Sequence, residues 1–161
     1  MIAVLIGILG TVIILLIDFF SDSIIRFISD VGLDFFNIES SIKQQNDIIR
    51  DADLLWIILL TISLCFGSVS SEIVFRGVLH NALKQRFKND FYVILIIALA
   101  YSVLMLLFSF PLGVGFFLLN FLTFTVLGFL YEINGNIYNT ILANIYYNIV
   151  IIITIIIGVG L

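Results

Sequence analysis

Charged residues are scarce in this chain of 161 residues. Asp, Glu, Lys and Arg together make up 11% of the sequence, whereas hydrophobic residues make up 62%. Soluble domains contain about 25% charged residues, so the composition excludes a water-soluble protein. A single proline and a mean hydropathy of +1.26 are equally atypical of soluble domains. The composition therefore predicts an all-α fold, a polytopic transmembrane helix bundle in a lipid bilayer.

Cysteine, histidine and positive charge are also scarce. The single cysteine, Cys65, lies in an apolar run, which excludes a disulfide framework. With one histidine, one cysteine and no glycine-rich phosphate loop, we predict neither a metal site nor a bound cofactor. The net charge of −4 argues against a nucleic-acid partner, because nucleic-acid binding needs a basic surface.

Long apolar runs predict about five membrane spans, because a helix needs roughly 20 apolar residues to cross about 30 Å of hydrocarbon. Residues 1–17 form the predicted first span, which we expect to be retained because it has no basic segment and no small-residue cleavage site. Residues 54–161 form the predicted transmembrane core. Its apolar runs cover residues 54–66, 72–84, 91–110, 112–131 and 137–161, with Pro111 and Gly135 at turns.

Small residues at positions 67–71 separate the first two runs of the core. Such residues allow close helix packing or a kink. The two runs therefore form either one long broken span or two short spans.

Acidic residues concentrate between the first span and the core, in residues 18–53. Eight of the eleven acids lie there: Asp18, Asp22, Asp30, Asp34, Glu39, Asp47, Asp51 and Asp53. We expect this acidic extramembrane segment to form one or two amphipathic helices on the bundle or the membrane surface. For residues 39–47 the alternative is a simple solvated connector. Asp18 and Asp22 have no spacing typical of a site, so we expect them to be solvated.

Basic residues mark the predicted cytoplasmic side. Lys84, Arg86 and Lys88 supply three of the seven bases within one short connection, and cytoplasmic connections carry an excess of Lys and Arg. The N-terminus is then inside, and the acidic segment and the C-terminus are outside. If residues 54–66 and 72–83 are separate spans, the acidic segment moves to the cytoplasmic side. The residue usage suits a prokaryotic plasma membrane.

A carboxylate and a guanidinium lie within the apolar sequence, at Glu72 and Arg76. Charges at this depth are costly and often mark function. On an α-helix the four-residue spacing puts these side chains about 40° apart, so a mutually neutralising ion pair accounts for both. Asn144 and Asn148 have the same spacing and are suited to hydrogen bonds between helices. The alternative is a functional polar cavity formed by these four side chains.

His80, the only histidine, lies eight residues after Glu72. In a regular α-helix that offset rotates the side chain by roughly 80° and moves it about 12 Å along the axis. We therefore do not expect a catalytic pair, and we predict an interfacial or helix-end histidine. Tyr147 is expected to be an interfacial or packing aromatic residue.

The pattern Glu72-x-x-x-Arg76-Gly77-x-Leu79 resembles the signature helix of the CPBP family, the intramembrane proteases related to the CAAX prenyl endopeptidase and to bacterial Abi proteins. Residues 128–148 are similar to the last conserved block of that family, which has a small-residue span, a glycine turn and a final helix. The two patterns occur in the family's order, and the resemblance covers about residues 68–150. It implies the fold of the CPBP transmembrane core.

Much of the family's catalytic set is missing. The resemblance implies two adjacent glutamates, a histidine four residues after an aromatic residue, and a His-x-x-x-Asn pair. The first glutamate and the two histidines are replaced by Ser71, Met105 and Asn144. The residues retained are Glu72, Arg76 and Asn148. In the family, the first glutamate and first histidine are implied to activate water, and the second histidine and the asparagine to donate to the oxyanion. None of the three replacements is a useful general base.

We therefore predict a noncatalytic CPBP-like membrane protein, a pseudoprotease. It would bind, scaffold or position another membrane or secreted protein, for example in bacteriocin immunity or cell-envelope assembly. One alternative is a CPBP-type intramembrane endopeptidase with altered chemistry around Glu72 and Asn148. A second alternative is a subunit of a membrane transporter complex.

Overall fold

The computed structural model describes residues 2–31, 38–110 and 112–158, and all regular structure within them is helical. The elements are α1 (Ile2–Asp30), α2 (Ile38–Arg50), α3 (Leu54–Glu72), the π-helix η1 (Ile73–His80), α4 (Asn81–Arg86), α5 (Asp90–Phe108), α6 (Leu112–Glu132) and α7 (Ile137–Ile157). Five helical runs are long and apolar enough to cross a bilayer: Ile2–Phe27, Leu54–Arg86, Asp90–Phe108, Val114–Glu132 and Ile137–Ile157. The predicted all-α bundle with five spans is confirmed.

Helix α1 continues through the predicted boundary at residue 17. Its apolar span extends to Phe27. Asp18 lies within this span, where its side chain is partly buried beside Tyr147 of α7. Asp18 is therefore less solvated than predicted, since its side chain is only partly exposed. The division into residues 1–17, 18–53 and 54–161 does not follow the helix boundaries, and as a division into functional units it stays a prediction.

Residues 39–47 belong to the amphipathic helix α2, so the alternative of a simple connector is wrong. Residues 32–37 of the acidic segment and the predicted turn at Pro111 lie outside the described residues. The predicted turn at Gly135 is present between α6 and α7. Gly135 has a φ of 65°, a left-handed conformation that glycine adopts without a steric penalty.

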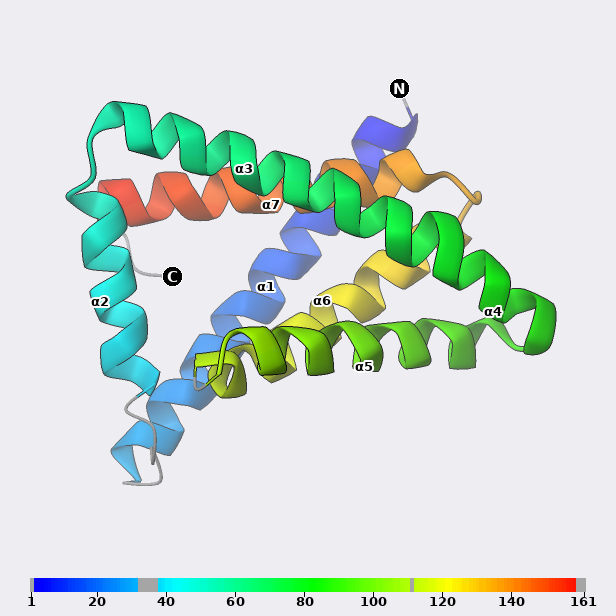
Figure 1. Ribbon diagram of the computed structural model, residues 1–161, viewed down its shortest axis with the longest axis horizontal. Helices are drawn as coiled ribbons and strands as arrows, with labels where there is room; N and C mark the ends of the chain where they lie inside the picture. The colour runs from blue at the N-terminus through cyan, green and yellow to red at the C-terminus, as the bar shows by residue number, and fades with distance from the viewer. Residues whose placement is uncertain (1, 32–37, 111, 159–161) are drawn as a thin grey trace.

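The second span is one continuous helical run, formed by α3, η1 and α4 (Figure 1). The alternative of two short spans is therefore wrong. In η1 the hydrogen bonds join residues i and i+5, and the turn is wider than in an α-helix. Nδ2 of Asn81 donates to the carbonyls of Arg76 and Gly77, at 3.3 and 2.9 Å, and so gives both a further partner. The close packing expected near Gly67 is absent at that residue, because a Cβ there would meet nothing within 4 Å.

Close helix packing occurs instead at two glycines of α1, where this helix crosses α7. A Cβ at Gly7 would lie 2.8 Å from Cβ of Leu142, and a Cβ at Gly10 would lie 2.9 Å from Cβ of Ala143. These contacts put the N-terminal half of α1 against the N-terminal half of α7. Small residues at such crossings let two helix backbones approach, which is a common way to pack helices in membranes.

The helices place two polar regions at opposite ends of the bundle. Helices α3 and α7 run antiparallel, since Ser68 contacts Asn148 whereas Gly77 lies near Ile137. The basic connection after Lys84 therefore lies at the end where α7 begins. Helix α2 lies at the other end, beside the C-terminal part of α7 (Figure 1).

Candidate functional site

Glu72 and Arg76 form a buried ion pair where α3 passes into η1. Both side chains are fully buried, and Oε2 of Glu72 lies 3.5 Å from Nε of Arg76. Thr140 of α7 lies beside the carboxylate and donates its own hydroxyl to the Ile137 carbonyl. Within the described residues, neither carboxylate oxygen of Glu72 has a hydrogen-bond partner, and neither has Nε or Nη1 of Arg76. The pair neutralises its charges but leaves these atoms without the hydrogen bonds that buried polar groups normally make.

The third guanidinium nitrogen of Arg76 connects η1 to α6. Nη2 donates to the Phe124 carbonyl at 2.7 Å, and Cζ lies 4.4 Å from the centre of the Phe124 ring. The ring of Tyr101 from α5 stacks on Phe124, and Phe75 contacts both rings edge-on. Arg76 therefore holds three helices together through one carbonyl and one aromatic cluster.

A chain of hydrogen bonds crosses from α3 to α7, one helical turn before Glu72. Nδ2 of Asn148 donates to Oγ of Ser68 at 2.8 Å, and Oγ of Ser68 donates to the Leu64 carbonyl at 2.9 Å. Nδ2 of Asn148 also lies 3.4 Å from Oδ1 of Asn144. Asn148 thus bonds to Asn144 on its own helix and to Ser68 on α3, and such interhelical bonds are common between membrane helices.

The other two substituted family positions offer no base to Glu72. Oγ of Ser71 donates to the Ser68 carbonyl of its own helix at 3.0 Å. Met105 lies one turn after Tyr101 on α5, where its carbonyl accepts a hydrogen bond from the backbone of Ser109. A methionine thioether is only a weak acceptor, and a serine hydroxyl without an adjacent base is a poor nucleophile and a poor base.

His80 takes part in a second polar cluster, which the sequence reasoning missed. Its Nε2 lies 2.5 Å from Oε1 of Glu132, and the side chain is buried. Nζ of Lys84 lies 2.9 and 2.8 Å from the two oxygens of Glu132 and 3.1 Å from Oδ1 of Asp90. His80 is the last residue of η1 and α4 follows it directly, so the prediction of an interfacial or helix-end histidine did not include this buried cluster. The spacing argument assumed a regular α-helix, whereas residues 73–80 form a π-helix, and Glu72, Arg76 and His80 are all buried.

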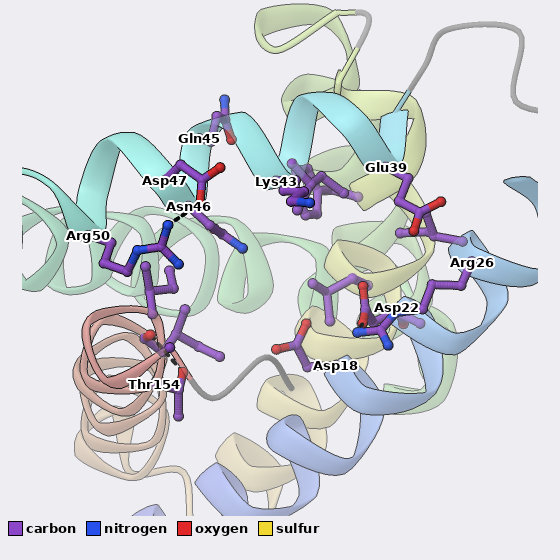
Figure 2. A pocket seen from close by; sticks show the side chains of 18 of the residues that line it. Asp18, Asp22, Arg26, Glu39, Lys43, Gln45, Asn46, Asp47, Arg50 and Thr154 are labelled. Atoms are coloured by element: carbon purple, nitrogen blue, oxygen red, sulfur yellow. Dashed lines mark hydrogen bonds and ion pairs between the residues drawn. The ribbon is translucent and has the colours of Figure 1, made fainter.

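A cavity of about 430 Å³ lies at the other end of the bundle, between α1, α2, α6 and α7 (Figure 2). We call it the α1–α2–α7 cavity, and its lining includes Asp18, Ser21, Lys43 and Tyr147. The sequence singled out none of these residues as a site. Asp18 and Lys43 are 25 positions apart and lie on different helices, so only the tertiary structure brings them to one space.

The comparison with known proteins bears on the Glu72 region. A family model described as Type II CAAX prenyl endopeptidase Rce1-like matches residues 53–150. The chain belongs to this family. The match covers α3 to most of α7, and it confirms the family resemblance that the motifs indicated. No curated protein and no solved structure matches the chain.

The site of this Rce1-like chain has a limited chemistry. Glu72 is a carboxylate held beside a cation, and Asn148 and Ser68 are hydrogen-bonding groups close by on facing helices. In the part of the chain that the structure describes, no three His, Cys, Asp or Glu side chains come together in a way that would hold a metal ion. The arrangement supplies hydrogen bonds and a paired charge but no base beside Glu72.

Proposed function

We propose that this multi-pass member of the Rce1-like family is noncatalytic, and that it binds and positions another membrane or secreted protein in a prokaryotic plasma membrane. The proposal rests on one observation. The Glu72 carboxylate is fully buried against Arg76, while the family positions that would supply a base carry Ser71, Met105 and Asn144.

Proteolysis would require these residues to activate a water molecule. A positioned general base commonly contributes about 10²–10⁴-fold to the rate. The Ser71 hydroxyl donates to its own helix, and the Asn144 amide cannot shuttle a proton. Losses within one catalytic unit do not simply add, and the remainder of such a unit retains little activity. A Glu72 carboxylate without a base beside it supports a structural role.

The α2 end of the molecule supports a role in binding. Helix α2 has no buried residue, carries a polar face, and presents an apolar side chain, Ile48, that is 64% exposed. This helix offers a mixed apolar and charged surface outside the apolar spans. Such a surface suits a protein ligand, as in bacteriocin immunity or cell-envelope assembly.

A cleavage assay tests the absence of catalysis. Full-length protein is purified in dodecyl maltoside and incubated with a fluorogenic farnesylated CAAX peptide and with an unprenylated apolar peptide. We expect the wild type and Glu72→Gln to cleave neither peptide above the rate of protein-free detergent. Glu132→Gln serves as a matched carboxylate control. Cleavage by the wild type that is lost in Glu72→Gln and kept in Glu132→Gln would overturn the proposal in favour of an endopeptidase with altered chemistry.

A crosslinking experiment tests the binding role. A photoreactive amino acid is placed at Gln45 on α2, which is exposed, and a control is placed at Lys88 at the opposite end. In native membranes we expect a discrete crosslinked protein from position 45 and none from position 88. A partner that crosslinks along the lipid-facing surface of α3 instead would favour the transporter-subunit alternative.

A further inference from the structure

The α1–α2–α7 cavity contains two charges that no other side chain neutralises. Arg26 pairs with Asp22 at 2.5 Å, and Arg50 pairs with Asp47 at 2.6 Å, so these four residues of the cavity wall cancel in pairs. In the described residues, neither Asp18 nor Lys43 has an oppositely charged side chain within 4.0 Å. Glu39 of α2 also lines the cavity, so its wall holds four acids and three bases, and among the described residues Asp18 and Lys43 are an acid and a base of this wall without an ion pair.

The two charges lie on different walls. Asp18 comes from α1 and Lys43 comes from α2, and both side chains line the cavity (Figure 2). Lys43 is exposed, whereas Asp18 is partly buried and hydrogen-bonded to Tyr147. The cavity thus has Asp18 on its inner wall and Lys43 at its rim, where α2 also contributes Glu39, Asp47 and Arg50.

Further polar atoms surround the acidic end. Ser21, one turn from Asp18 on α1, is only 4% exposed and lines the cavity. Its hydroxyl oxygen has no hydrogen-bond partner among the described residues. A buried hydroxyl without a partner is costly, and a bound polar group would supply the missing bond. Together with the oxygens of Asp18 and Tyr147, it forms a set of acceptors suited to an ammonium group.

We propose that this cavity binds a compact zwitterion, with a primary ammonium group at Asp18 and an anionic group at Lys43. A simple cation would bring a like charge towards Lys43, and a simple anion would bring one towards Asp18. A molecule with both charges neutralises both residues. The volume of about 430 Å³ falls within the range of small-molecule sites, about 300–1,000 Å³. This inference goes beyond the proposed role in protein binding and does not depend on it.

Two sources share this chemistry: a phosphoethanolamine lipid head group, and a free zwitterion of the same kind. Both carry an ammonium and a phosphate a few bonds apart. The cavity lies beside the spans α1 and α7 and is covered by the amphipathic helix α2, so either source has a route to it. The experiment below separates them.

Binding is measured by thermal unfolding of the full-length protein in dodecyl maltoside, titrated with O-phosphoethanolamine. We expect a saturable rise in the unfolding temperature that ethanolamine alone and inorganic phosphate alone do not reproduce. Asp18→Asn and Lys43→Gln should each weaken binding about tenfold or more, because each removes one charge-assisted contact. The matched controls are Asp51→Asn and Lys88→Gln, which alter residues outside the cavity lining and should bind as the wild type does.

Two results would overturn the proposal. The first is the absence of a saturable shift in the wild type. The second is an affinity of Lys43→Gln for O-phosphoethanolamine that equals the affinity of Lys88→Gln. This comparison remains valid even if Asp18→Asn fails to fold, because Lys43 is an exposed residue of α2. A repeat in nanodiscs identifies the source. If O-phosphoethanolamine binds in phosphatidylglycerol nanodiscs but not in phosphatidylethanolamine nanodiscs, the lipid head group already occupies the cavity and is the natural ligand. If it binds equally in both, the natural ligand is the free zwitterion.

Discussion

Nδ2 of Asn148 on α7 donates a hydrogen bond of 2.8 Å to Oγ of Ser68 on α3. The two residues are 80 positions apart, and they lie one helical turn from the Glu72 ion pair. Asn148 is one of three family residues that this chain retains, and its side chain is directed to a helix contact. Two of the three retained motif residues, Arg76 and Asn148, thus join helices to one another.

The first prediction concerns that bond. Ser68→Ala and Asn148→Ala should each destabilise the protein, and a double-mutant cycle should give a coupling energy of about 0.6 kcal/mol, with about 1.7 kcal/mol as an upper limit. The measurement is unfolding in mixed micelles. Gln45→Ala, on the exposed face of α2, is the control. A coupling energy of zero would mean that the two side chains do not interact in the folded protein.

The second prediction concerns the buried ion pair. Glu72→Ala or Arg76→Ala leaves the other charge buried and unpaired, and should cost about 3–5 kcal/mol of the free energy of unfolding. Replacing both, as in Glu72→Leu with Arg76→Met, removes both charges and should restore most of that loss. Unfolding midpoints in dodecyl maltoside give the comparison. A double variant as unstable as the sum of the single variants would contradict a purely pairwise, structural role.

The third prediction concerns helix packing at glycine. Gly10→Ala puts a methyl group 2.9 Å from Cβ of Ala143 and closer still to Leu130, so the helices must separate. Such overpacking costs about 1–3 kcal/mol. Gly67→Ala, where a Cβ meets nothing within 4 Å, is the matched control and should stabilise α3 by about 0.5–1 kcal/mol. Unfolding measurements should show opposite signs for the two variants, and equal signs would contradict the packing described.

The fourth prediction concerns the cluster at the other end of the bundle. Glu132→Ala removes the shared partner of His80 and Lys84 and leaves the buried His80 ring without its hydrogen bond. We expect a loss of about 1–3 kcal/mol in the free energy of unfolding. Asp90→Ala removes only an exposed contact to Lys84 and should cost less than about 1 kcal/mol. If both variants lost the same stability, Glu132 would not be the centre of the cluster.

The fifth prediction concerns orientation in the membrane. With Cys65 replaced by Ala, single cysteines are introduced at Gln45 and at Lys88. The excess of basic residues around position 88 predicts that this position faces the cytoplasm. A membrane-impermeant maleimide should therefore label position 88 only in inverted vesicles and position 45 only in intact cells. The reversed labelling pattern would place α2 in the cytoplasm and exclude a partner outside the cell.

The helical class and the spans followed from composition and apolar run length, which depend only on local sequence. The ion pair between Glu72 and Arg76 was foreseeable for the same reason, since a spacing of four residues brings side chains together on any helix. The predicted first span ends at residue 17 because Asp18 is an acid, whereas helix α1 continues to Asp30. Within that helix Asp18 lies beside Tyr147, 129 positions away in the sequence.

The sequence by itself determined that this protein is a bundle of membrane-spanning helices that retains only part of a family motif. Those features depend on the identity of residues and on spacings within one helix. The tertiary structure decided the partner of His80 and the cavity that Asp18 and Lys43 share, because both depend on how separate helices pack. It also decided the π-turn at Ile73–His80, which changes the face on which every later side chain of that helix lies. Local sequence has no signal for such contacts, since their energy arises only when distant helices meet.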